Sequence, residues 1–116
     1  MKVLFVLNDA PYGTERSYNE LRLAGSVAKR EDVEVLVFLI GDAAACAKAG
    51  QKVPQGYYNA EHMVRSVARR GGVVGVCGTC MDARGIVDVE LAEGCHRSTL
   101  DGLTEWTLDA DKVLVF

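Results

Sequence analysis

Short apolar runs alternate with helical segments along this 116-residue chain, and this alternation constrains the fold more than any other feature. Residues 2–7 and 33–40 have the pattern of strands buried on both faces of a sheet. Residues 73–77 predict a third buried strand and residues 113–116 a last one. Strands that alternate with helices of this length form β–α–β units. We therefore predict an α/β fold with a mostly parallel sheet and helices on both of its faces.

The first two predicted helices follow the first two strands. Thr14 offers an N-cap, and Ser17 with Glu20 has the spacing of a capping box one turn later. This helix should continue to about residue 30 along an apolar stripe formed by Tyr18, Leu21, Ala24 and Ala28. A short alanine-rich helix is expected after Gly41 and Asp42, ending at Gly50.

The clearest helical periodicity lies between residues 60 and 68. Asn59 is the expected N-cap, and Gly71 with Gly72 is expected to end the helix. The apolar positions follow the i, i+3, i+4, i+7, i+8 rule and are Ala60, Met63, Val64, Val67 and Ala68.

The last third of the chain has weaker patterns. Residues 78–85 predict a tight segment with one or two helical turns. Val87, Val89 and Leu91 alternate with polar residues, which predicts a half-exposed or edge strand. A final helix is expected over residues 98–108, with a buried side formed by Leu100, Leu103 and Thr107 beside Trp106.

Size and charge limit the possible functions. A chain of 116 residues has room for one domain, 1–116. The net charge of −3 argues against a protein that binds the phosphate backbone of a nucleic acid. The nearest basic cluster, Arg65, Arg69 and Arg70, falls on one predicted helix, where a solvated face is expected.

No apolar stretch approaches the ~20 residues of a membrane span. The first apolar run ends at Leu7 without the pattern of a signal peptide, so we expect a cytoplasmic protein. In that reducing compartment the four cysteines should be free thiols, redox groups or metal ligands.

Cys77 is the strongest candidate for a reactive residue. Ligands of open parallel sheets bind at the carboxyl ends of the strands, and of the three loops at that edge only the one after residue 77 contains a nucleophile. If a helix begins at Gly78, its free amide groups favour a thiolate at Cys77. Arg84 offers a positive charge nearby. The alternative is a buried structural thiol.

Cys80 completes a Cys-Gly-Thr-Cys motif with Cys77, a spacing that permits a disulfide. Cys80 is a candidate resolving thiol, a second sulfur carrier or a spectator. Cys95 and His96 are adjacent and lack the paired spacing of a zinc site, so we predict no metal. Cys46 is expected to be a small core residue, and no glycine-rich phosphate motif predicts a cofactor.

Several segments together suggest a known family. They are residues 10–13 with Glu15, 21–24, 41–42, 50–52, 77–86, 106–108 and 110–114. With these segments the chain resembles the DsrE/DsrF-like proteins over essentially its whole length, and most closely the YchN-like members. The family's cysteine, which a glycine follows eight residues later, maps onto Cys77 with Gly85 after Arg84.

The resemblance implies a three-layer α/β/α fold with a mostly parallel five-stranded sheet. It also implies a homo-oligomer, a hexamer in the YchN-like group, and sulfur donor or acceptor proteins as partners. In the sulfur-relay branches one cysteine carries sulfane sulfur as a persulfide. Those branches have small apolar residues after the cysteine, whereas this chain has Cys80 and Asp82, as YchN-like members do.

Three functional hypotheses follow. The first is a persulfide-carrying sulfurtransferase with Cys77 and Cys80 as catalytic candidates. The second is a redox protein that uses the same two thiols as a dithiol and disulfide. The third is a non-catalytic oligomeric module that binds a small ligand. The expected substrate-binding residues are Tyr12, Gly78, Asp82 and Arg84.

Overall fold

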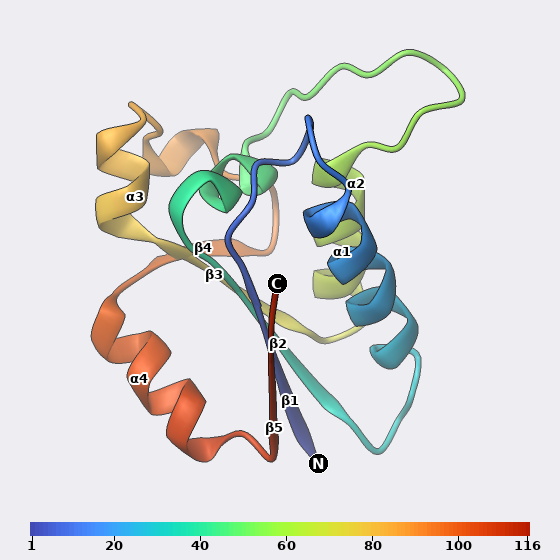
Figure 1. Ribbon diagram of the computed structural model, residues 1–116, viewed down its shortest axis with the longest axis vertical. Coiled ribbons are helices and arrows are strands. Elements are labelled where there is room, and N and C mark those ends of the chain that lie inside the picture. The colour runs from blue at the N-terminus through green and yellow to red at the C-terminus, as the bar shows by residue number, and fades with distance from the viewer.

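A five-stranded parallel sheet forms the centre of the protein (Figure 1). The computed structural model describes residues 1–116. The strands are β1 (Lys2–Leu7), β2 (Glu34–Leu39), β3 (Val73–Cys77), β4 (Cys95–Ser98) and β5 (Lys112–Val115). Their order across the sheet is β4-β3-β2-β1-β5. The predicted α/β fold with a mostly parallel sheet is therefore confirmed.

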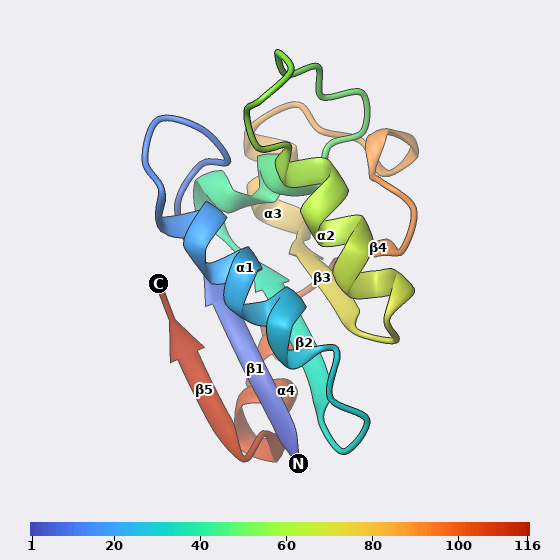
Figure 2. The ribbon, with the colours of Figure 1, turned by 90° about the vertical axis from the view of Figure 1, so that its right-hand side faces the viewer.

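Helices cover both faces of this sheet. The α-helices are α1 (Arg16–Val27), α2 (Ala60–Arg69), α3 (Gly78–Ala83) and α4 (Leu100–Asp109). Two 3₁₀ helices, η1 (Gly41–Ala47) and η2 (Asp88–Glu90), complete the chain. Figure 2 shows α1 and α2 side by side over one face, with α4 on the opposite face.

The larger core lies between the sheet and the pair α1 and α2. Alternate strand residues point into it, and paired neighbours such as Phe5 and Val37 are fully buried. Leu21 and Ala24 of α1 and Val64 of α2 pack against them. This side of the molecule contains most of the buried apolar surface and fixes the positions of the strand ends.

The core under α4 is much smaller. It consists of Leu4, Val6, Phe38 and Cys77. The Trp106 ring packs edge-on against Phe38, with ring centroids 6.1 Å apart. No residue of α4 is fully buried, and Leu100 is 71% exposed. The predicted buried side of this helix is therefore wrong: Leu103 is partly buried, but Leu100 and Thr107 are exposed.

The strand predicted from Val87, Val89 and Leu91 is also wrong. Residues 88–90 form η2, and Val89 is almost fully exposed. The strand at this edge is β4, which pairs with β3 and contains the polar sequence Cys-His-Arg-Ser. An edge strand needs few apolar residues because only part of it is buried, so hydrophobic alternation does not reveal it.

The start of α1 differs from the predicted capping pattern. Glu15 occupies the N-cap position and makes no side-chain cap. The hydroxyl groups of Thr14 and Ser17 donate to Asp9 instead. Glu20 is fully buried and neither of its carboxylate oxygens has a hydrogen-bond partner. Thr14 and Ser17, which were predicted to cap the helix, thus connect it to Asp9 in the loop after β1.

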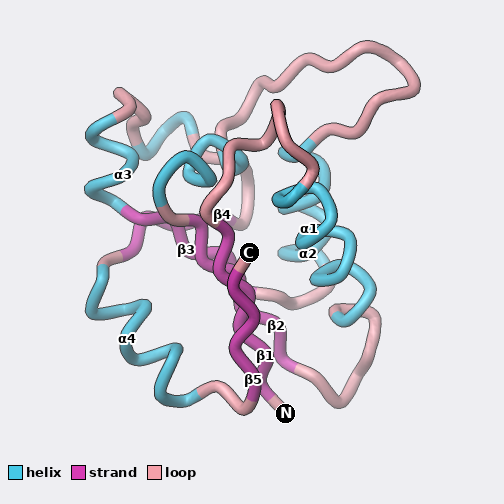
Figure 3. Tube along the Cα trace, in the orientation of Figure 1, coloured by secondary structure: helices cyan, strands magenta, loops and turns pink.

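The boundaries of α2 agree with prediction. The Asn59 side chain accepts a hydrogen bond from the His62 amide at 3.1 Å. Gly71 follows the helix with a φ of +92°, a conformation that favours glycine. A long connector, residues 48–59, joins η1 to this helix (Figure 3). No helix of the structure is long and apolar enough to cross a bilayer.

Candidate functional site

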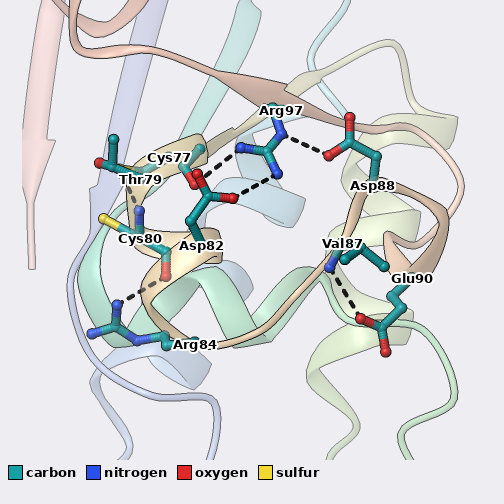
Figure 4. A network of polar contacts seen from close by, with 10 residues as sticks. Cys77, Thr79, Cys80, Asp82, Arg84, Val87, Asp88, Glu90 and Arg97 are labelled. Atoms are coloured by element: carbon teal, nitrogen blue, oxygen red, sulfur yellow. Dashed lines mark hydrogen bonds and ion pairs between the residues drawn. The ribbon is translucent and has the colours of Figure 1, made fainter.

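Cys77 is the last residue of β3 and the N-cap of α3. Its sulfur accepts a hydrogen bond from the backbone amide of Cys80 at 3.3 Å. The Thr79 hydroxyl shares a second hydrogen bond with it, also at 3.3 Å. Figure 4 shows the three residues around this first turn of α3. The sequence-based prediction that a helix begins beside the Cys77 sulfur is confirmed.

Gly78 permits the tight passage from β3 into α3. A Cβ atom on this residue would lie 2.9 Å from Arg97 Nη1 and 3.1 Å from the Ser98 carbonyl oxygen. A Cβ here would therefore displace the end of the Arg97 side chain, and the Ser98 carbonyl would have to move by a few tenths of an ångström. Glycine at this position therefore brings the cysteine turn and the edge strand into direct contact.

A cleft of about 380 Å³ opens beside Cys77. Its walls combine apolar side chains with hydroxyl groups and one pair of opposite charges. The lining residues are Phe38, Ile40, Cys77, Gly78, Thr79, Cys80, Asp82, Arg97, Ser98, Thr99 and Leu100. Cys77 is only 8% exposed, but it lines this opening and is not enclosed by the core. A small group, or the end of a partner's side chain, can therefore approach it.

The environment of Cys77 favours its thiolate. Burial acts to raise the pKa of Cys77, but hydrogen bonds from the Cys80 thiol, the Thr79 hydroxyl and backbone amide groups outweigh it and lower the pKa from its ordinary value. Hydrogen bonds to a sulfur favour the charged form because they stabilise the anion. Cys77 is thus the more acidic thiol of the motif.

Cys80 behaves differently although it lies three residues away. Burial raises the pKa of Cys80, and its hydrogen bond to Cys77 raises it further. Its sulfur accepts a hydrogen bond from the Gly41 amide at 3.2 Å, which ties it to the start of η1. Both thiols are free. The pKa of Cys77 is therefore lowered and that of Cys80 is raised, although the two residues share one turn.

Arg97 belongs to the cleft, although the sequence did not identify it. Its guanidinium crosses from β4 to α3 and donates to the Gly78 carbonyl and the Asp82 carboxylate, both at 3.1 Å (Figure 4). Its Nε donates to Asp88 at 2.6 Å. The strand that carries Arg97 was not predicted, so nothing in the sequence placed this side chain near Cys77.

The predicted site residues are only partly brought together. Cys77, Gly78, Cys80 and Asp82 all line the cleft. Arg84 does not line it: its guanidinium pairs with Asp42 at 2.7 Å and donates to the Cys80 carbonyl at 3.0 Å. It is therefore linked to the backbone of Cys80 and lies outside the space in front of the Cys77 sulfur.

Tyr12 lies apart from this cleft. Its hydroxyl donates to Gln51 and accepts from the Ala60 amide, and its ring stacks on Tyr58 with centroids 5.6 Å apart. It lines a separate cavity formed with the connector between η1 and α2. The structure thus gives Tyr12 a role in fixing the loops and no contact with the thiol pair.

The other two cysteines are core residues. Burial raises the pKa of Cys46 and of Cys95 to about 12. Both pack in the main core, as expected for Cys46. No group of three or more His, Cys, Asp or Glu side chains has the arrangement of a metal site. Cys46 and Cys95 thus differ from Cys77 and Cys80, which line the cleft.

The parallel sheet with a cysteine where a central strand meets a short helix defines a small α/β protein with a thiol site. The model of the DsrE/DsrF-like family matches residues 1–116, and the chain belongs to this family.

Individual relatives agree with this assignment. The chain is 40% identical to Protein YchN of Escherichia coli (strain K12) over 116 residues, covering 99% of this chain and 98% of YchN. It is 35% identical to the uncharacterized protein MJ0989 of Methanocaldococcus jannaschii over 116 residues, 100% of both chains. The crystal structure of ychN protein from E. coli superposes with a TM-score of 0.93 over 99% of this chain and 98% of that chain.

A more distant structure shares the fold alone. It is the protein of unknown function MTH1491 from Methanobacterium thermoautotrophicum, with a TM-score of 0.76 and 14% identity over 99% of this chain and 98% of that chain.

Proposed function

We propose that the protein carries sulfane sulfur on Cys77 as a persulfide and passes it to a partner. The observation that supports this most directly is the Cys77 sulfur itself. It accepts an amide hydrogen bond and lines an open cleft. A thiolate is the nucleophile in sulfur transfer, so a site of this kind needs an acidic, reachable thiol.

The proposed step is a simple displacement. The Cys77 thiolate attacks the outer sulfur of a donor persulfide, R–S–SH. A new bond forms between Cys77 Sγ and that sulfur while the donor's S–S bond breaks, and the electron pair leaves with the donor as R–S⁻. The product is a Cys77 persulfide, which an acceptor thiolate attacks in the same way. No oxidant or cofactor is required, because both steps conserve electrons.

The donor and the acceptor are proposed to be thiol-bearing proteins. The reaction is assigned to the cytoplasm, where a reducing milieu keeps the four cysteines free. Cys80 then has the role of a neighbour whose backbone amide donates to the Cys77 sulfur.

Intact-mass measurement tests the persulfide. After incubation with a small persulfide donor, the wild type should gain one sulfur atom that a thiol reductant removes. Cys77→Ser should abolish the gain, and Cys80→Ser should retain it. Cys46→Ser is a matched control because that thiol is buried in the core. A wild type that gains no sulfur would contradict the proposal.

A second candidate function is a redox dithiol. The geometry of this turn supports it, because the Cys77 sulfur accepts the Cys80 amide at 3.3 Å and both cysteines line the same cleft. A disulfide or peroxide oxidant would accept two electrons while both thiols lose their protons. In that case oxidation should remove two hydrogens from the wild-type mass, and either serine variant should prevent it.

We also propose that the protein works as a homo-oligomer, a hexamer by analogy with the YchN-like group. Exposed apolar side chains on α4 and β5 support this. Leu108 is 83% exposed, and Val115 and Phe116 are also exposed. Leu100, the first residue of α4, is also exposed and lines the Cys77 cleft, so a partner copy that covers the whole of α4 would also enclose the thiol.

A further inference from the structure

Arg97 uses every nitrogen of its guanidinium to join three segments. Nη1 donates to the Gly78 carbonyl and Nη2 to Asp82, each at 3.1 Å. Nε donates to Asp88 at 2.6 Å. Gly78 begins α3 and Asp82 lies near its end, while Asp88 begins η2. One side chain of the edge strand thus binds along the whole of α3 and ties it to the following segment.

This helix has little stability of its own. It contains six residues, too few for its backbone hydrogen bonds to offset the entropy of ordering the chain. Of its residues only Gly78 and Met81 are fully buried. The amide that contacts the Cys77 sulfur belongs to Cys80, in the middle of the helix. The orientation of the Cys80 N–H group therefore depends on the contacts that hold α3 in place.

We propose that Arg97 is a positioning residue that locks α3 against β4 and so keeps the Cys80 amide directed at the Cys77 sulfur. The close fit at Gly78, where a Cβ would lie 2.9 Å from Nη1, supports direct packing of the guanidinium on this turn. The inference rests on the proposed role of Cys77 as the reacting thiol.

Arg97 does not act here as an anion-binding group. The carboxylates of Asp82 and Asp88 take up its charge, and Asp82 also lines the cleft. A lysine would retain one positive charge but has no planar fork with which to reach three separate acceptors. The two roles can therefore be distinguished: a lysine restores a charge effect and fails to restore a positioning effect.

The test measures how fast Cys77 reacts with iodoacetamide as a function of pH. All variants are made in a Cys80→Ser background, which retains the amide of residue 80 and leaves one accessible thiol. Burial raises the pKa of Cys46 and Cys95 to about 12, so these thiols contribute little signal below pH 9. Circular dichroism and thermal unfolding verify that each variant is folded.

Arg97→Met should lower the alkylation rate at pH 7 about fivefold and move the midpoint of the pH profile upward, because a hydrogen bond to the anion is weakened. Arg97→Lys should behave like Arg97→Met. The matched control Arg69→Met removes an exposed arginine on α2 that has no ion-pair partner, and should leave rate and midpoint unchanged. A wild-type profile in Arg97→Met, or full rescue by lysine, would overturn the proposal.

Gly78→Ala provides a second test that removes no charge. Its Cβ would displace the Arg97 guanidinium, so the midpoint should again move upward. This variant decides the question if Arg97→Met does not fold, and an unchanged midpoint would count against positioning. Alkylation needs no sulfur donor. If the wild type forms no persulfide with a donor, the proposed function is contradicted, but the proposed role of Arg97 is unaffected.

Discussion

The pKa values of two cysteines three residues apart are shifted in opposite directions in this protein. Amide and hydroxyl donors surround the Cys77 sulfur and lower its pKa, while burial and the bond to Cys77 raise the pKa of Cys80. Thr79 is the one side-chain hydroxyl in this arrangement. The difference is therefore local, and single substitutions at this turn should change it.

Thr79→Val removes the hydroxyl and keeps the shape of the side chain. We expect the Cys77 pKa to rise and its alkylation rate at pH 7 to fall about two- to threefold, because one weak hydrogen bond to sulfur is lost. Thr104→Val is the matched control, since that hydroxyl donates to a carbonyl of α4. Equal rates in wild type and Thr79→Val would show that the hydroxyl does not stabilise the thiolate.

Glu20 predicts a pH dependence of stability. Burial raises its pKa from 4.5 to about 8. Between these values the folded chain retains a proton that the unfolded chain releases, so the free energy of unfolding should fall as pH rises from about 4.5 to about 8. Glu20→Gln should remove this slope and exceed the wild type at pH 8 by more than about 1 kcal/mol.

Urea unfolding at pH 5 and pH 8 measures this effect. Glu31→Gln, at an exposed position, is the control and should keep the wild-type slope. A wild type that is equally stable at both pH values would show that Glu20 does not titrate in this range.

At the scale of single residues, the sequence identified the turn that contains the two thiols, but few of the other residues that line the cleft. Cys77, Gly78, Cys80 and Asp82 were found because they follow a strong strand pattern in one contiguous segment. Arg97 was missed because it reaches the site through pairing of distant strands, which local patterns do not encode. Tyr12 was expected among the substrate-binding residues, whereas its hydrogen bonds place it beside another cavity.

At the scale of elements, the buried strands and α2 were predictable and the sheet edge was not. β1, β2 and β3 are apolar because helices or neighbouring strands cover them, so their sequences alone reveal them. β4 is polar and is defined by its pairing with β3. α4 was predicted as a helix with a buried side, but the isolated chain leaves that side exposed.

Substitution of alanine for glycine should have opposite effects on stability at positions 75 and 25. At Gly75 in β3 a Cβ would lie 3.1 Å from the Trp106 ring, so Gly75→Ala should push α4 outward and destabilise by about 1–3 kcal/mol. At Gly25 in α1 nothing lies within 4 Å, so Gly25→Ala should stabilise by about 0.5–1 kcal/mol. Denaturant midpoints measure both. If Gly75→Ala were neutral, the close packing of α4 on the sheet would be contradicted.

At the scale of the whole molecule, the two faces of the sheet are unequally covered. α1 and α2 bury one face deeply, while α4 covers a core of only four buried residues. The apolar residues left exposed on α4 and β5 form the surface that the proposed oligomer would bury. In the proposed oligomer, assembly would also affect the thiol cleft, because Leu100 lies both on α4 and in the wall of the cleft.

Leu108→Glu tests this assembly. A charge in an apolar interface is costly to desolvate, so the variant should shift the wild-type oligomer toward monomer in sedimentation velocity. Val89→Glu is the control, since Val89 is even more exposed than Leu108 but belongs to η2 and not to α4 or β5. A monomeric wild type, or an unchanged oligomer in Leu108→Glu, would rule out this surface as the interface.

The proposed function requires Cys77 to be an acidic thiol that reagents in solution can reach. The most direct measurement is the pH profile of iodoacetamide alkylation of the wild type, with the modified residue located by fragment mass spectrometry. Cys77 should react before the other three cysteines, with a midpoint below the ~8.5 of an ordinary cysteine. A Cys77 that resists alkylation, or that reacts with a midpoint at or above that value, would contradict it.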